Sequence, residues 1–251
     1  MNGVMQRLDT EMARRGLALS REKAQRLIMA GRVRVNSRPA AKPDLRVGCT
    51  TPIAIVGPAA EYVSRGAYKL LAALDHFGVD VAGRQALDVG ASTGGFTDVL
   101  LRRGAARVIA LDVGYGQLAE RLRTDNRVTV IDRTNIRYII AATLPYSPNL
   151  VVVDTSFISL KLVLPAITKI VTAAADIIVL IKPQFEVGKA NVGKGGVVRQ
   201  PLMRQQAVEE VLDTARTLGL DAAGTIESPI KGASGNHEFL ALLHHNVSNP
   251  A

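Results

Sequence analysis

Apolar residues in the first quarter of the chain recur at the three- and four-residue spacing that is typical of helices. One such stretch covers residues 5–15. Its apolar face consists of Met5, Leu8 and Met12. A second stretch covers residues 21–30, with Ser20 as the expected N-cap and Gly31 as the expected stop. The pattern therefore predicts two short helices near the start of the chain.

The spacing then changes to the alternation of a β-strand. Val33 and Val35 alternate with arginines, Asn36 and Ser37 supply turn residues, and a further apolar run covers residues 52–56. The first 60 residues are therefore expected to form a small α+β unit.

From about residue 65 onward, helical stretches alternate with short apolar runs rich in β-branched residues. Helices are predicted over residues 64–78 and 202–219, among others. Seven strands are predicted at residues 85–89, 107–111, 128–131, 150–153, 177–181, 224–227 and 238–243. Because strands separated by helices form parallel sheets covered on both faces, this pattern predicts a doubly wound α/β domain with a mostly parallel sheet.

Positive charge is distributed unevenly between the two regions. The chain has 251 residues and a formal net charge of +9, from 31 Lys and Arg against 22 Asp and Glu. The first 60 residues hold 11 of the basic residues and 4 of the acidic ones, a balance of +7. A localised excess of this kind is typical of a module that binds a polyanion, with a solvated basic face as the alternative.

Several residues of the N-terminal region form a recognisable pattern. They are Arg7-Leu8-Asp9, Ser20-Arg21, Ala24, Ile28, Gly31, Val33, Val35 and Asn36. The pattern resembles the S4 domain, an RNA-binding module, over roughly residues 5–56, and it implies that this unit docks RNA. The RNA-binding candidates of the whole chain are Arg7, Arg21, Lys23, Arg32, Arg34, Arg38, Arg65, Lys189 and Lys194.

A loop of small residues follows the first predicted strand of the second region. Its glycines, Gly90, Gly94 and Gly95, let the backbone bend and let a ligand approach main-chain N–H groups at the start of the next helix. The dinucleotide-binding signature requires glycine at position 92, which is Ser here, so a dehydrogenase is disfavoured. Asp112 ends the second strand, where its carboxylate can accept both hydroxyls of a ribose or, alternatively, cap the next turn.

A glycine loop followed by a strand-end acid resembles the S-adenosylmethionine-dependent methyltransferases. This resemblance implies a Rossmann-like fold with a seven-stranded sheet, and S-adenosyl-L-methionine as the cofactor. The cofactor-binding candidates are Asp88, Gly90, Ser92, Thr93, Gly94, Gly95, Phe96, Asp112, Val113, Thr134 and Asp154.

Four ionisable residues fall at the ends of predicted elements. They are Lys69, Asp154, Lys182 and Glu238. Asp154 and Lys182 each end an apolar strand, at the sheet edge that holds ligands in doubly wound folds. Because an isolated buried charge is costly, we expect the four to compensate one another, with separate structural ion pairs as the alternative. The set resembles the Lys-Asp-Lys-Glu tetrad of ribose 2′-O-methyltransferases of the FtsJ (RrmJ) type.

The tetrad suits methyl transfer to a ribose. A ribose hydroxyl is a poor nucleophile at neutral pH, so it must be positioned, deprotonated or both. We expect Lys182, beside the Lys69 cation, to act at the hydroxyl and accept its proton. Asp154 is expected to orient Lys182, and Glu238 to hold Lys69 or the ribose.

Motifs along the rest of the chain extend this resemblance. In order they are SRGAYKL, DVGASTGGFTDVLL, DVGYGQL, DTSFISL, IKPQFEVGK, GGVV and SGNHEF. Together with the S4 unit they are similar to the TlyA (hemolysin A) family. The resemblance implies an S4 domain over residues 1–60, a linker over 61–64 that is a candidate for coupling RNA docking to cofactor binding, and a methyltransferase domain over 65–251.

The same family resemblance implies an activity. Its members methylate the 2′-hydroxyl of cytidine in ribosomal RNA (rRNA) of the large subunit (23S), and sometimes also of the small subunit (16S). They are linked to capreomycin and viomycin susceptibility, and some carry a haemolytic activity. The expected partners are therefore rRNA and ribosomal subunits.

Two further features are expected to meet the RNA. The glycine-rich segment 188–198 is expected to be a mobile loop that contacts phosphates through Lys189 and Lys194, with a merely solvated loop as the alternative. Phe157 and Phe185 are candidates for stacking on a flipped nucleotide, although core packing is favoured for each.

Composition disfavours other classes of function. The single cysteine, Cys49, allows no internal disulfide and fits a cytoplasmic protein, and the four histidines lack ligand spacing, so no metal is expected. The longest apolar stretch, residues 170–181, is shorter than the ~20 residues of a membrane helix, and no signal peptide is evident. A membrane-active haemolysin and a catalytically silent ribosome-assembly factor are the alternatives, and the oligomeric state is left open.

Overall fold

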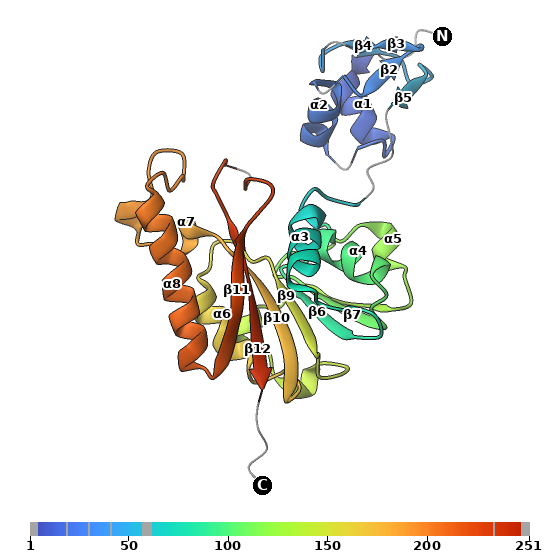
Figure 1. Cartoon of the computed structure of the whole chain (residues 1–251). Helices are drawn as coiled ribbons and strands as arrows, with labels where there is room; N and C mark the ends of the chain where they lie inside the picture. Colours follow the sequence, from blue (N-terminus) through green and yellow to red (C-terminus); the bar gives the residue numbers. More distant parts are fainter. Residues whose placement is uncertain are drawn as a thin grey trace. The chain divides into compact units, whose positions relative to one another are not determined.

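The computed structural model describes residues 5–18, 20–29, 31–40, 42–56, 62–232 and 234–246. The chain divides into two units, Met1–Glu61 and Tyr62–Ala251 (Figure 1). Glu61, the first residue of the expected linker, lies outside the described residues.

The N-terminal unit combines short helices with short antiparallel strands. In chain order its elements are β1 (Gln6–Arg7), α1 (Leu8–Arg14), α2 (Arg21–Met29), β2 (Val33–Val35), β3 (Arg38–Pro39), β4 (Arg46–Val47) and β5 (Ile53–Ile55). β1 pairs with β4, and β2 lies between β3 and β5. The turn between β2 and β3 is at Asn36 and Ser37, whose φ angles are 49° and 66°. Ser20 caps α2 as expected, since its Oγ accepts a hydrogen bond from the Lys23 amide at 3.1 Å.

The prediction for the first helix was wrong at its start. Gln6 and Arg7 are extended and pair with β4, so α1 begins only at Leu8. Leu8 and Met12 are fully buried, whereas Met5, which was expected on the same face, is 53% exposed. A long-range strand pair therefore replaces the first turn of the predicted helix.

The larger unit is a doubly wound α/β domain. Its strands are β6 (Gln85–Val89), β7 (Arg107–Leu111), β8 (Val128–Ile131), β9 (Leu150–Val153), β10 (Ala174–Ile181), β11 (Leu220–Glu227) and β12 (Phe239–Asn246). Its helices are α3 (Ala67–Phe77), α4 (Gly95–Arg102), α5 (Glu120–Arg123), α6 (Leu160–Ile167), α7 (Pro183–Glu186) and α8 (Pro201–Thr217), with short 3₁₀ turns η1 (Ile136–Tyr138), η2 (Ala141–Thr143) and η3 (Lys189–Asn191).

The described strands of this unit form one seven-stranded sheet in the order β11-β12-β10-β9-β6-β7-β8. Among these strands β12 alone runs in the opposite direction, which confirms the predicted mostly parallel sheet. β6 to β9 have the predicted bounds. β10 and β11 begin three and four residues earlier than predicted, because each continues along β12.

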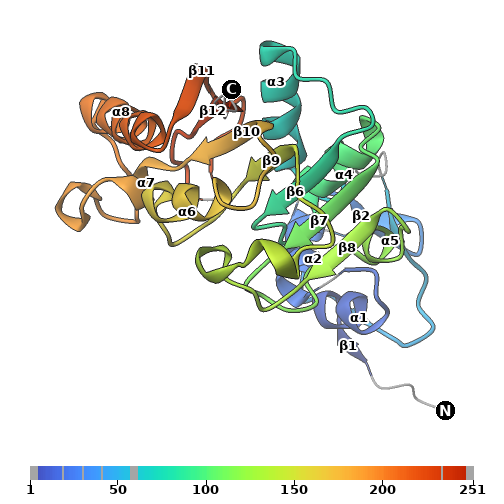
Figure 2. The ribbon, with the colours of Figure 1, turned by 90° about the horizontal axis from the view of Figure 1, so that it is seen from below.

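Alternate residues of each strand face opposite sides of the sheet. In β9, Leu150 and Val152 pack with α3 and α4, whereas Val151 and Val153 pack with α6 and α8. Figure 2 shows these helices on the two faces of the sheet. All four are fully buried, and each such side chain stabilises the fold by about 1.5–3 kcal/mol. Two apolar layers therefore hold the strands in place from both faces.

The topology brings three strand ends to one edge of the sheet. β7 and β9 flank β6 on opposite sides, and the chain winds outward in both directions from this point. Ligands of doubly wound sheets bind in the crevice at the carboxyl ends of such strands. The glycine loop follows β6, Asp154 follows β9 and Lys182 follows β10, so all three meet this crevice.

Candidate active site

A cavity of about 490 Å³ opens at the carboxyl edge of the sheet. Its walls come from α3, the glycine loop, the ends of β9 and β10, and the segment before β12. The lining includes Ser64, Lys69, Asp88, Ser92, Thr93, Asp154, Ser156, Lys182, Gln184, Ser234 and Glu238. The predicted tetrad therefore shares one cavity.

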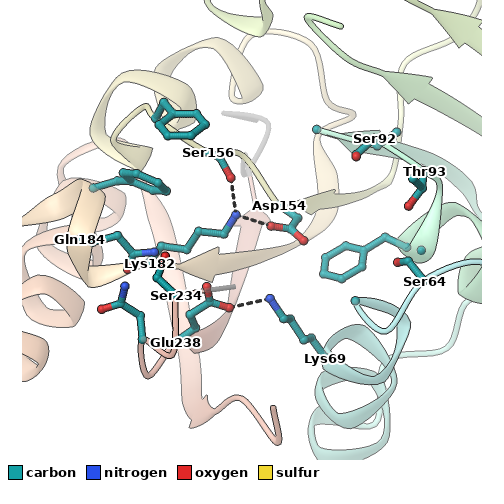
Figure 3. A pocket seen from close by; sticks show the side chains of 18 of the residues that line it. Ser64, Lys69, Ser92, Thr93, Asp154, Ser156, Lys182, Gln184, Ser234 and Glu238 are labelled. Carbon is teal, nitrogen blue, oxygen red and sulfur yellow. Dashed lines mark hydrogen bonds and ion pairs between the residues drawn. The ribbon is translucent and has the colours of Figure 1, made fainter. Parts of the chain in front are cut away.

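The four tetrad residues form two ion pairs (Figure 3). Lys69 Nζ lies 2.5 Å from Glu238 Oε2, and Lys182 Nζ lies 2.6 Å from Asp154 Oδ1. Both lysines are only 8% exposed. Removal of one partner would leave the other charge buried and uncompensated, which is strongly destabilising. Each ion pair therefore stays formed in the folded protein.

Ser156 belongs to the same cluster but was missed by the sequence reasoning. Its Oγ accepts a hydrogen bond from Lys182 Nζ at 2.9 Å. Lys182 therefore has two oxygen partners on the loop after β9, which fixes the direction in which its amine points. The signal available in the sequence was a hydroxyl two residues after the strand-end Asp154.

The glycines of the loop after β6 are required by the chain's own packing. Gly90 has a φ of 84°, and a Cβ there would lie 2.6 Å from the carbonyl oxygen of Asp154. Gly94 has a φ of 93°, and its Cβ would collide with Leu122. Gly94 lines neither cavity of the site, so the expected ligand approach does not explain this residue.

Residues 62–64, which were expected to belong to a linker, pack against α4. The Val63 amide donates a hydrogen bond to Asp98 Oδ2 at 2.9 Å. Ser64 lines the cavity, and its Oγ would lie 2.2 Å from a Cβ at Gly95. This segment is therefore part of the wall of the site.

Asp88 is buried beneath the glycine loop. Its Oδ2 accepts hydrogen bonds from the Thr97 amide at 2.9 Å and from Thr97 Oγ1 at 2.7 Å. Its Oδ1 has no hydrogen-bond partner among the described residues, although Asp88 lines the cavity. Burial raises the pKa of this carboxyl to about 7, and the nearby Asp154 carboxylate adds to the effect. Such a site suits a ligand that brings a positively charged donor.

A second cavity, of about 730 Å³, adjoins the first along Gly90, Ser92 and Asp154. Asp112, Val113 and Thr134, which the sequence analysis named as cofactor-binding candidates, line it. The two carboxylate oxygens of Asp112 accept hydrogen bonds from the amides of Ser92 and Gly114, both at 2.7 Å. Since a carboxylate has about four lone-pair positions, Asp112 caps this turn and can still receive ribose hydroxyls.

Phe157 contradicts the expectation of core packing. Its side chain is 91% exposed, and its φ of 65° lies in the left-handed region that a bulky residue rarely adopts. Its ring lies 5.3 Å from the ring of half-buried Phe185. Phe157 is three residues after Asp154 in the sequence, and Phe185 is three residues after Lys182. The two rings therefore lie together at the mouth of the site.

Glu186 joins the two loops that carry these rings. It is buried and accepts hydrogen bonds from Ser159 Oγ at 2.6 Å and from the Leu160 amide at 2.9 Å. Burial raises the pKa of its carboxyl. The turn after β10 is thereby fastened to the start of α6.

The glycine-rich segment 188–198 folds against the site. Buried Asn236 accepts a hydrogen bond from the Val198 amide at 2.9 Å and donates one to the Gly196 carbonyl at 2.8 Å. Gly196 and Val192 line the first cavity, whereas the two lysines of the segment are exposed. The sequence reasoning named these lysines but missed Asn236, which anchors the segment.

Two of the N-terminal RNA-binding candidates stabilise their own unit. Asp9 is fully buried, and the guanidinium groups of Arg7 and Arg21 lie 3.0 and 3.1 Å from its Oδ2. The hydrogen bond from Arg7 is the main reason why the pKa of Asp9 lies well below its usual range. Arg32 is half-buried and donates to the Val56 carbonyl. The exposed candidates are Arg21, Lys23, Arg34, Arg38, Arg65, Lys189 and Lys194.

The strand order, the glycine loop after β6 and the paired lysines and carboxylates at the carboxyl edge define a methyltransferase of the Rossmann-like class. Sequence models of the FtsJ-like methyltransferase and of the S4 domain match residues 62–245 and 6–48. The chain belongs to the TlyA family of FtsJ-like methyltransferases.

Relatives from several bacteria are similar over almost the whole chain. The 16S/23S rRNA (cytidine-2′-O)-methyltransferase TlyA of Mycobacterium tuberculosis is 52% identical over 238 residues, which cover 94% of this chain and 89% of the relative. Hemolysin A of Brachyspira hyodysenteriae is 40% identical over 236 residues, with coverages of 94% and 98%. The solved structure described as "Putative hemolysin from Streptococcus thermophilus" is 40% identical, covers 97% of this chain and 90% of its own, and has a TM-score of 0.78.

The alternative of a membrane-active haemolysin raises the question of membrane-spanning helices in the part of the chain that the structure describes. None of its helices has the length and apolar character to cross a bilayer.

Proposed function

We propose that the protein transfers a methyl group from S-adenosyl-L-methionine to the 2′-hydroxyl of a cytidine in ribosomal RNA, and that its S4 unit docks the RNA. The observation that carries the proposal is the pair of buried lysine–carboxylate ion pairs in one cavity beside the glycine loop. The similarity to the M. tuberculosis enzyme supports the choice of substrate. Work on ribosomal subunits would place the protein in the cytoplasm.

The residues present fit the cofactor. Asp88 Oδ1, a buried acceptor with no partner among the described residues, suits the ammonium group of the methionyl portion. Asp112 suits the ribose hydroxyls, and Val113 and Thr134 line the space for the adenine. When bound, S-adenosyl-L-methionine supplies an electrophilic methyl group.

Lys182 is the residue that acts on the substrate hydroxyl. Asp154 and Ser156 contact the Lys182 amine from one side. The other side of the amine can therefore face the ribose hydroxyl. Lys182 acts in its neutral amine form, because an ammonium group has no lone pair to accept a proton. It takes up the hydroxyl proton as the ribose oxygen gains the methyl group, with the sulfur of the cofactor as the leaving group. Lys69 and Glu238 line the same cavity as a balanced pair, which positions the ribose without adding net charge. Alignment of this kind can supply several kcal/mol of the barrier.

The exposed ring of Phe157 supports recognition of a flipped nucleotide. A ribose inside a stacked helix cannot enter a cavity, so the nucleotide must leave its stack. An aromatic ring at the mouth offers the base a replacement surface, which is worth about 1–3 kcal/mol per stacked base. The fully exposed position of Phe157, at the cost of a left-handed backbone, fits this role.

The segment 62–64 supports a link between RNA docking and cofactor binding. It directly follows the S4 unit in the chain, and Ser64 lines the cavity beside Gly95. A shift of this segment when the S4 unit engages RNA would change the wall of the cofactor site. Removal of the Ser64 hydroxyl should therefore alter how strongly RNA affects cofactor affinity.

Label transfer to isolated ribosomal subunits tests the proposed function. The protein is incubated with methyl-labelled S-adenosyl-L-methionine and separated large or small subunits, and 2′-O-methyl positions are then mapped in the rRNA. We expect label at a cytidine of the large subunit, and the separate reactions show whether the small subunit is also a substrate. Binding to subunits without any label transfer would overturn the proposal in favour of an assembly factor. Lysis of erythrocytes without transfer to either subunit would overturn it in favour of a haemolysin.

A further inference from the structure

Two buried side-chain oxygens lack a hydrogen-bond partner among the described residues, and both belong to residues that line the first cavity. They are Asp88 Oδ1 and Gln184 Oε1. The great majority of buried hydrogen-bond acceptors in proteins have a partner. A buried acceptor that lacks one and borders a cavity therefore indicates that the ligand supplies the donor. Asp88 is accounted for by the cofactor. Gln184 has no role in the chemistry described so far.

Gln184 lies between the two groups that would contact the substrate nucleotide. It is two residues after Lys182, which acts on the ribose, and directly before Phe185, whose ring packs against Phe157. Figure 3 shows its side chain beside Lys182 in the pocket. A nucleotide with its ribose at Lys182 and its base against the rings would present the edge of the base to this amide.

The turn that carries Gln184 is held in place by its neighbours. The Phe185 amide donates a hydrogen bond to the Lys182 carbonyl at 2.9 Å, and Glu186 binds Ser159 and the Leu160 amide. An acceptor on a rigid turn discriminates between ligands better than one on a loop that adapts.

We propose that Gln184 determines base specificity by accepting a hydrogen bond, through Oε1, from the exocyclic 4-amino group of cytosine. Uracil carries a carbonyl oxygen at the same position, so two acceptors would face each other and both would lose their partners. A site that is built to bind an amine rejects an analogue that lacks it, because the buried acceptor is left unpaired. This inference rests on the proposed function and adds the feature of the base that the site recognises.

A comparison of cytidine with uridine at the methylated position tests the proposal. After the position has been mapped, subunits are prepared with either base there, and kcat/KM for methyl transfer is measured on both. The wild-type protein should prefer cytidine by about tenfold or more. Gln184→Met keeps the length of the side chain but removes the amide, so the preference should fall toward one. Gln184→Glu keeps an acceptor oxygen, so it should retain the preference.

Gln205→Ala is the matched control, because Gln205 is exposed on α8 and its amide bonds to Glu209 within the helix. This variant should leave the preference unchanged. An undiminished preference in Gln184→Met, or a lost preference in Gln184→Glu, would overturn the inference. Should Gln184→Met fail to fold, Gln184→Leu takes its place with the same expected loss of preference. Failure of the proposed function differs, since the wild-type protein would then methylate neither base.

Discussion

Replacement of Asp88 by asparagine should stabilise the methyltransferase unit at alkaline pH. The pKa of the Asp88 carboxyl is raised from 3.8 to about 7, mainly by burial. The folded state therefore holds the proton more tightly than the unfolded state. The stability that this proton contributes is fully present below pH 3.8 and is lost as the pH rises through about 7. The asparagine side chain would not titrate, and its amide oxygen can still accept the hydrogen bonds from Thr97.

The size of the effect follows from the pKa. Each pH unit between the two pKa values corresponds to about 1.4 kcal/mol. Two of those units lie between pH 5 and the folded-state pKa of about 7. The stability of Asp88→Asn relative to the wild type should therefore increase by about 3 kcal/mol from pH 5 to pH 8. The predicted quantity is the change, from pH 5 to pH 8, in the stability difference between the variant and the wild type. An effect of the substitution on the hydrogen bonds to Thr97 that is the same at both pH values therefore cancels.

Tyrosine fluorescence during urea unfolding is a suitable assay. The chain has no tryptophan, and all five tyrosines lie in residues 62–251, so the signal reports this unit alone. Free energies of unfolding are measured without cofactor at pH 5 and pH 8 for both proteins. Asp221→Asn, at an exposed position on β11, controls for the loss of one negative charge.

An equal difference between Asp88→Asn and the wild type at both pH values would refute the reasoning. The same variant should bind S-adenosyl-L-methionine at least tenfold more weakly, because it lacks the charge that faces the ammonium group. Equilibrium dialysis with labelled cofactor measures this. Retained affinity would show that the free oxygen of Asp88 does not contact the cofactor.

Three further predictions concern transfer and docking. Lys182→Ala should lower kcat by about a hundredfold or more while RNA binding is unchanged, and near-normal turnover would contradict its role. Phe157→Ala should raise KM for subunits about tenfold with little change in the unfolding free energy, since the ring is exposed; an unchanged KM would exclude stacking. The double variant Arg34→Ala and Arg38→Ala should weaken rRNA binding and reduce the slope of log affinity against log salt by about 1.4–1.8, and an unaltered slope would place the RNA elsewhere.

Two control variants remove basic residues that lie outside the proposed contacts. Arg216→Ala on α8 removes an exposed arginine of the other unit and should leave the salt slope unchanged. Lys161→Ala removes a lysine that pairs with Glu210 outside the cavity, so transfer should persist.

The predicted strand bounds were most accurate for β6 to β9. β6 to β9 are short apolar runs bounded by polar or small residues, and their bounds agree with the prediction. The prediction was less accurate where pairing extends a strand into residues without an apolar pattern, as in β11. It was wrong at Met5, because the pairing of Gln6 with Val47 overrides local helix spacing.

The candidate site could be predicted as a set of residues, together with the contact between Asp154 and Lys182, but its loop residues could not. Strand-end positions pointed to Asp154 and Lys182 because parallel strands end at one edge. Ser156, Gln184 and Asn236 were missed, since loop residues follow no period that distinguishes a side chain in the cavity from one in solvent.

By itself, the sequence determined the two-part organisation, the doubly wound fold and the four ionisable residues of the site, because periodic burial and motif spacing are local properties. The sequence left open whether Glu238 holds Lys69 or the ribose, and the tertiary structure pairs it with Lys69, 169 residues away; the expected contact of Asp154 with Lys182 is also formed. The tertiary structure also decided that Phe157 is exposed. Apolar character favours burial, but a left-handed backbone in a loop turns the ring outward, and only the packing around that loop can impose such a conformation.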